Sequence, residues 1–81
     1  MNPITKLAYD LTDDDLSKAV VEIIDWHDMA ILRDGVVRNI AKQIVGLNAT
    51  LANSALRIAE EAIMKEAAMR YVRIYKGELV I

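Results

Sequence analysis

The chain has 81 residues, of which 54% are hydrophobic and 27% charged, and its formal net charge is −2. A chain of this length predicts one small domain over residues 1–81. Because it contains no cysteine, a disulfide framework, a cysteine-based zinc site and a cysteine nucleophile are excluded. The sequence has no run of about 18 apolar residues that would predict a membrane span. Residues 1–11 do not resemble a secretory signal, so we expect a cytoplasmic protein, in the host cytoplasm if it is viral.

The charges are divided unevenly between the two parts of the chain. Residues 1–34 have three cationic side chains and eight carboxylates, for a net charge of −5, whereas residues 35–81 have seven cations and four carboxylates, for +3. The acidic and basic parts could attract each other across copies, or the basic part could bind an anion. Alternatively, both are solvated faces of helices.

The first predicted helix covers residues 12–32, after a loop indicated by the Asn-Pro pair at positions 2–3. Thr12 is a favourable N-cap, and the aspartates at 13–15 place negative charge in the first turn, where it stabilises the helix dipole. The apolar stripe of this helix follows helical spacing and comprises Leu16, Ala19, Val20, Ile23, Ile24 and His27.

A second helix is predicted over residues 35–46. An Asp-Gly pair interrupts the pattern before it, and Asp34 is one candidate for its N-cap. Gly46 fits a C-terminal cap, and Asn48 or Thr50 fits the N-cap of the next helix. The second helix has a clean apolar stripe made of Val36, Val37, Ile40, Ala41, Ile44 and Val45.

The third predicted helix, over residues 50–76, is apolar on too many sides to pack on one face of a small domain. Of the 26 residues at 50–75, 16 are apolar or aromatic, and none is glycine or proline. A helix packed on one side needs an apolar stripe of only about 100°. Moreover, 26 helical residues span ~39 Å, which exceeds the diameter of about 30 Å expected for a compact chain of this length. A glycine at 77 ends this helix, and a short apolar tail follows.

We therefore predict an all-α fold with three helices, in which a long helical hairpin assembles with other copies into a homo-oligomeric helical bundle. Surplus apolar residues on the third helix, together with the tryptophan, are the candidates for this interface. They are Trp26, Leu56, Ile63, Met64 and Met69.

No catalytic or metal-binding motif is evident, so we expect no enzyme activity and no cofactor. Adjacent helical residues point about 100° apart, so the four residues at 25–28, which include Trp26 and His27, cannot converge on one metal ion. We expect His27 to lie near the core with a bonded ring nitrogen. Duplex DNA is not an expected partner either, because the chain is acidic and lacks helix-turn-helix spacing.

Cations alternate with aromatic rings at the end of the third predicted helix, over residues 70–76. Arginine donates forked hydrogen bonds to phosphate, and tyrosine offers a surface on which a base can stack. This pattern favours a nucleotide site; the alternative is a helix end whose cations complement the dipole. The candidate ligand-binding residues are Tyr9, Arg33, Arg38, Arg70, Tyr71, Arg73 and Tyr75.

The pattern within residues 30–70 is similar to that of a known family. Its sharpest element is Glu-Glu-Ala-x-Met at 60–64, preceded by Ala-Leu at 55–56. This segment resembles the C-terminal helix of the small phage anti-CBASS cyclic-nucleotide sponges. The resemblance implies a helical homo-oligomer, such as a hexamer, that sequesters an immune signalling nucleotide between its copies without catalysis.

Two functions follow from these observations. In the first, the protein is a non-enzymatic oligomer that binds a signalling nucleotide, as a phage anti-defence protein would. In the second, it is a protein-interaction module, that is, an inhibitor, adaptor or assembly subunit whose apolar helix face covers a protein partner.

Overall fold

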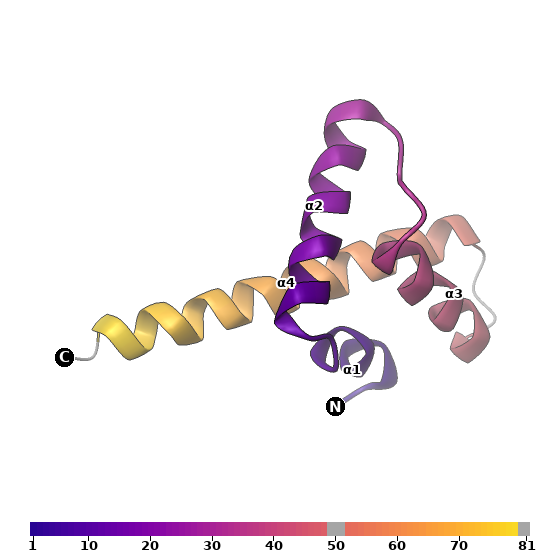
Figure 1. Cartoon of the computed structure of the whole chain (residues 1–81). Coiled ribbons are helices and arrows are strands. Elements are labelled where there is room, and N and C mark those ends of the chain that lie inside the picture. Colours follow the sequence, from indigo (N-terminus) through magenta and orange to yellow (C-terminus); the bar gives the residue numbers. More distant parts are fainter. Residues whose placement is uncertain (49–51, 80–81) are drawn as a thin grey trace.

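The computed structural model describes the backbone of residues 1–48 and 52–79, and the side-chain surroundings of residues 1–47 and 54–75. Over these residues the chain is all-helical, which confirms the predicted fold class. The prediction of three helices is wrong, because the N-terminal segment forms a helix of its own (Figure 1). The elements are α1 (Pro3–Tyr9), α2 (Asp13–Met29), α3 (Val36–Asn48) and α4 (Ala52–Leu79).

The short helix α1 forms where the sequence pattern indicated a loop. Asn2 is its N-cap, since its side-chain oxygen accepts a hydrogen bond from the Thr5 N–H at 2.8 Å. Pro3 occupies the first helical position, where its missing N–H costs nothing. A helix of seven residues is too short for a clear periodicity and depends on tertiary packing. That packing comes from Ala8, which is buried, and from Leu7, which lies against the core.

α2 has a defined cap at each end. The Thr12 side chain accepts a hydrogen bond from the Asp15 N–H at 3.1 Å, which confirms the predicted N-cap. At the other end, Ala30 is left-handed, with a φ of 58°, and its N–H donates to the Trp26 carbonyl. α2 therefore ends at Met29, a few residues before the end that its apolar pattern predicted.

The start of α3 is capped by a side chain from α2. The Glu22 carboxylate accepts hydrogen bonds from the Val36 N–H at 3.1 Å and the Val37 N–H at 3.0 Å. A negative group at this position satisfies free amides and complements the helix dipole. Gly35 makes the approach possible, because a Cβ there would collide with this carboxylate. The predicted break is thus confirmed, but Glu22 rather than Asp34 supplies these hydrogen bonds.

Two predicted helix ends differ from the structure. α3 continues through Gly46 to Asn48, and α4 continues through Gly77 to Leu79. A glycine permits a helix to end but does not require it. The predicted caps at Asn48 and Thr50 lie outside the residues whose side-chain surroundings the structure describes.

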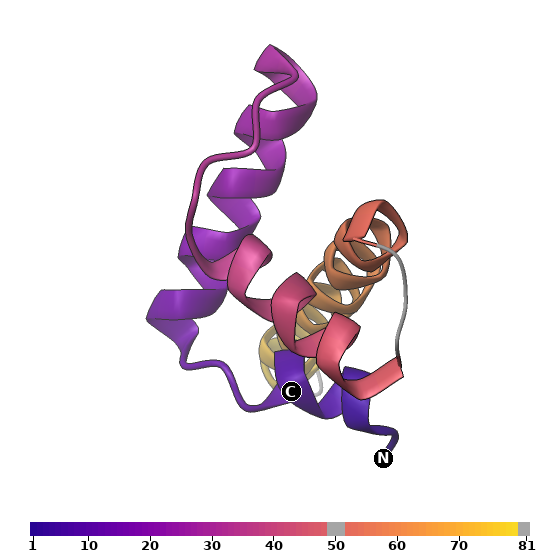
Figure 2. The ribbon, with the colours of Figure 1, turned by 90° about the vertical axis from the view of Figure 1, so that its right-hand side faces the viewer.

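The core lies where α2 and α3 pack against the first part of α4, on one side of that helix (Figure 2). Ile44, Ile63 and Val37 are its largest fully buried side chains. Burying each such side chain contributes about 1.5–3 kcal/mol. The core consists of Leu16, Ala19, Ile23, Leu32, Val37, Ile40, Ala41, Ile44, Ala55, Ala59 and Ile63.

α4 continues well beyond the helices that cover its first part (Figure 1). Its 28 residues correspond to ~42 Å of helix, and the longest dimension of the molecule is 46 Å. We call residues 54–67 the packed half of α4 and residues 68–79 its C-terminal arm.

Candidate functional site

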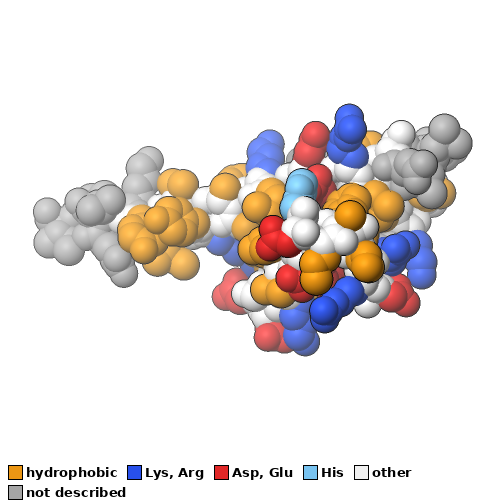
Figure 3. All heavy atoms as spheres, turned by 90° about the horizontal axis from the view of Figure 1, so that it is seen from above, with side chains coloured by type: hydrophobic (Ala, Val, Ile, Leu, Met, Phe, Trp, Pro, Cys, Tyr) orange, Lys and Arg blue, Asp and Glu red, His pale blue; other side chains and the backbone are white. Residues whose placement is uncertain are grey.

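The C-terminal arm exposes large apolar side chains on most of its circumference. At 100° per residue, these side chains point in directions that together span more than half of the helix. Figure 3 shows them gathered on the projecting end of α4. The most exposed is Ile74, at 62%. The group comprises Met69, Tyr71, Val72, Ile74 and Tyr75.

Arg70 fastens the base of the arm to the N-terminal helices. Its guanidinium donates to Glu66 at 2.7 Å and to Asp13 at 2.8 Å. It also donates to the backbone carbonyls of Tyr9, at 3.1 Å, and Leu11, at 2.7 Å. Glu66 is only 4% exposed, so its charge needs such a partner. The hydrogen bond to Glu66 raises the pKa of Arg70 further above its ordinary value.

The seven predicted ligand-binding residues do not come together in one copy. Arg70 is engaged as described, and Arg38 donates to the Leu32 carbonyl at 3.2 and 3.0 Å. Tyr71 and Tyr75 stack on each other, with ring centroids 4.3 Å apart.

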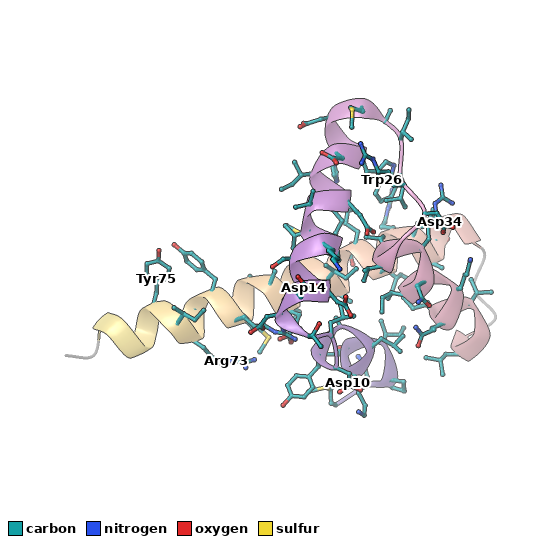
Figure 4. The ribbon with its side chains drawn as sticks, in the orientation of Figure 1. Asp10, Asp14, Trp26, Asp34, Arg73 and Tyr75 are labelled. Carbon is teal, nitrogen blue, oxygen red and sulfur yellow. The ribbon has the colours of Figure 1, made fainter. Side chains whose placement is uncertain are left out.

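Figure 4 shows Tyr75 and Arg73 pointing to opposite sides of α4. This tyrosine and Arg73 therefore do not face one shared pocket within a single copy. Of the other two predicted residues, Tyr9 is exposed at the end of α1, and Arg33 is exposed in the connection from α2 to α3.

A cation and an aromatic ring do meet in a cleft between α2 and α4. Its volume is about 530 Å³, within the usual size of small-molecule sites. The His27 Nε2 is hydrogen-bonded to the Glu60 carboxylate, so its ring nitrogen has a partner as predicted, but the His27 side chain is 66% exposed instead of near the core. The cleft is lined by Trp26, His27, Ala30, Leu56, Arg57 and Glu60.

Sequence reasoning missed Arg57 and Glu60 as cleft residues. They stand one turn apart on α4 and so share a face, which was the one available signal. This face meets Trp26, which lies 31 residues before Arg57 in the chain, because α2 crosses α4 at this point.

The outward side of α2 is a second exposed apolar surface. We define the outer α2 face as Ser17, Val21 and Ile24, flanked by Asp14 and Asp28. Val21 is 55% exposed and Ile24 is 50% exposed, so placing Ile24 in the core stripe was wrong. Asp14 pairs with Lys18 at 3.1 Å, and this hydrogen bond raises the pKa of Lys18.

The predicted interface residues separate into buried and exposed groups. Ile63 is fully buried in the core of a single copy, and Trp26 and Leu56 are partly buried against that core. Met64 is 41% exposed and Met69 is 45% exposed. Of the five predicted interface residues, only these two methionines are exposed enough in a single copy to contact another molecule.

Among the residues that the structure describes, no three acidic, histidine or cysteine side chains lie close enough to share a metal ion. Within the same residues, the helices are too short or too polar to cross a membrane. Comparison of the chain with protein-family models, curated proteins and solved structures gave no match. The resemblance to the cyclic-nucleotide sponges therefore stays a prediction from residues 30–70.

Proposed function

We propose that this protein is a non-enzymatic protein-interaction module whose C-terminal arm is covered by a protein surface. The observation that supports this function is the exposure of five large apolar side chains around most of one helix. A contiguous apolar surface of this kind marks an interaction site in soluble proteins. Covering five side chains that are about half exposed contributes on the order of 5 kcal/mol.

The helical state of the arm gives a second argument for a partner. The arm continues a packed helix and needs no nucleation of its own, but most helical stability comes from packing of an apolar face. The arm has 12 residues and extends away from α2 and α3 (Figure 1). A partner that covers its apolar faces would supply the missing packing.

The test compares two substitutions of equal chemistry at exposed apolar positions. Val72→Asp lies on the arm, and Leu47→Asp lies on α3; both parent side chains are 52% exposed. We expect Val72→Asp to lower the affinity of association, with another copy or with another protein, by tenfold or more. Leu47→Asp should leave this affinity unchanged. Sedimentation equilibrium and binding titrations measure it, and equal affinities for the two variants would overturn the proposal.

A second candidate function is sequestration of a signalling nucleotide, and the cleft between α2 and α4 favours it. There the Trp26 ring can stack with a base, and the Arg57 guanidinium can donate to phosphate. Calorimetric titration with cyclic dinucleotides and mononucleotides tests this. We expect heat of binding for the native chain and its loss in Arg57→Ala, with Lys42→Ala as a control on α3. No heat with any of these nucleotides would exclude it.

A further inference from the structure

We propose that the partner of the arm is a second copy of this chain, and that the arm of each copy packs on the outer α2 face of the other. This inference rests on the proposed function and specifies its partner. It follows from the charges that flank the two exposed apolar surfaces, from their relative placement, and from their combined area.

The charge of the arm disfavours packing of one arm against another. The arm has three cations, Arg70, Arg73 and Lys76, and one carboxylate, Glu78, for a net charge of +2. Two arms packed side by side would bring these like charges together at short range, which is unfavourable in a partly dehydrated contact.

The outer α2 face has the opposite charge. Exposed carboxylates lie at both of its ends, on Asp14 and Asp28; because Asp14 is paired with Lys18, these three side chains have a net charge of −1. Exposed ion pairs contribute little energy individually, so these charges would select the face and register, whereas apolar burial would supply the affinity.

The two surfaces also face the same open region of the molecule. Ile24 lies eleven residues after Asp13, three turns later on nearly the same side of α2. The Asp13 carboxylate is bonded to Arg70 at the base of the arm, so this side of α2 faces the arm. Figure 4 shows Tyr75 on the side of α4 from which α2 rises.

Figure 1 shows α2 rising from the middle of α4, so exposed apolar side chains lie on both sides of the angle between α2 and the arm. A two-fold axis can place each arm along the α2 of the other copy, which forms the same contact twice and closes the assembly.

The exposed apolar area matches what a dimer needs. The arm exposes five large apolar side chains, and Val21 and Ile24 on the outer α2 face add two more that are 50–55% exposed. At about 80–130 Å² for each half-exposed side chain, they total on the order of 700 Å² per copy, close to the ~800 Å² that each partner contributes to a standard interface.

Because the chain has no cysteine, introduced thiols report the contact directly. Ile24→Cys and Val72→Cys chains are mixed in equal amounts, denatured and refolded together, and oxidised mildly. We expect a disulfide-linked heterodimer as the main product. Leu47→Cys mixed with Val72→Cys is the control, with a comparably exposed thiol on α3, and should give little. Sedimentation equilibrium of the native chain should show a dimer, and Ile24→Asp should weaken it at least tenfold.

Other outcomes overturn the inference in distinguishable ways. Preferential linkage of Val72→Cys to itself would indicate contact between arms instead of the arm and α2. A native chain that stays monomeric at every concentration would exclude a second copy as the partner. In that case the proposed function would still stand if another protein bound the native chain and Leu47→Asp equally but Val72→Asp weakly. It would fail if that contrast were also absent.

Discussion

The two halves of α4 have similar apolar content but opposite surroundings. In the packed half, Ala55, Ala59 and Ile63 are fully buried among α2 and α3. In the arm, Val72 is 52% exposed and Ile74 is 62% exposed, although they are as apolar as the buried residues. Hydrophobicity therefore establishes that a helix needs covering, but the neighbouring elements establish which part is covered within one copy.

The border between these halves lies at Glu66 and Arg70. A buried carboxylate on α4 meets a guanidinium that also binds Asp13 and two carbonyls before α2. No buried side-chain nitrogen or oxygen lacks a hydrogen-bond partner in the described part of the chain. Because the charges of this cluster are paired and hydrogen-bonded, the boundary between the apolar core and the arm contains no unpaired buried charge.

The largest contrast is expected between Ile63→Asp and Val72→Asp. Ile63→Asp places an unpaired charge in the core and should cost more than about 4 kcal/mol, enough to unfold a domain of this size. Ile40→Asp should do the same. Val72→Asp should change the stability of the single copy by less than about 0.5 kcal/mol. Circular dichroism during thermal unfolding, at concentrations where the protein is monomeric, measures both. Equal losses would mean that the arm is packed within one copy.

A smaller effect is expected at the border of the two halves. Glu66→Ala leaves Arg70 without its principal partner and should lower stability by about 2–3 kcal/mol. For a domain of this size, that corresponds to a fall in Tm of roughly 10–20 °C. Glu61→Ala is the matched control, because Glu61 is exposed and lies five residues earlier in α4. If Glu66→Ala and Glu61→Ala melt together, the buried pair does not stabilise the base of the arm.

The smallest effect concerns α3, which supports only the packed half. Gly35→Ala forces the Glu22 carboxylate away from the first amides of α3 and should cost about 1 kcal/mol, the usual loss for a helix cap. Gly46→Ala adds a methyl group in open space inside the same helix and should gain about 0.5–1 kcal/mol. Chemical denaturation measures both values. Neither change should alter association through the arm, and a change there would mean that α3 contributes to the contact.

Local chemistry explains which features were predictable. Thr12 caps α2 because its hydroxyl reaches an amide three residues away, and the Asp-Gly break at 34–35 falls between helices as expected. The cap of α3 was not predictable, since Glu22 lies 14 residues before Val36 in sequence and reaches it only after folding. α1 was missed for a similar reason, because a seven-residue helix depends on packing with other elements.

The sequence by itself determined that this protein is all-helical, where α2 begins, and that its last helix has more apolar surface than one small domain can cover. Those properties depend on composition, spacing and contacts within one turn. Only the tertiary structure decided that Arg70 is a structural cation, that Trp26 and Arg57 share a cleft, and that Ile24 is exposed while Ile63 is buried. These outcomes depend on how α2 crosses α4, and that crossing is determined by side-chain packing between residues tens of positions apart in the chain.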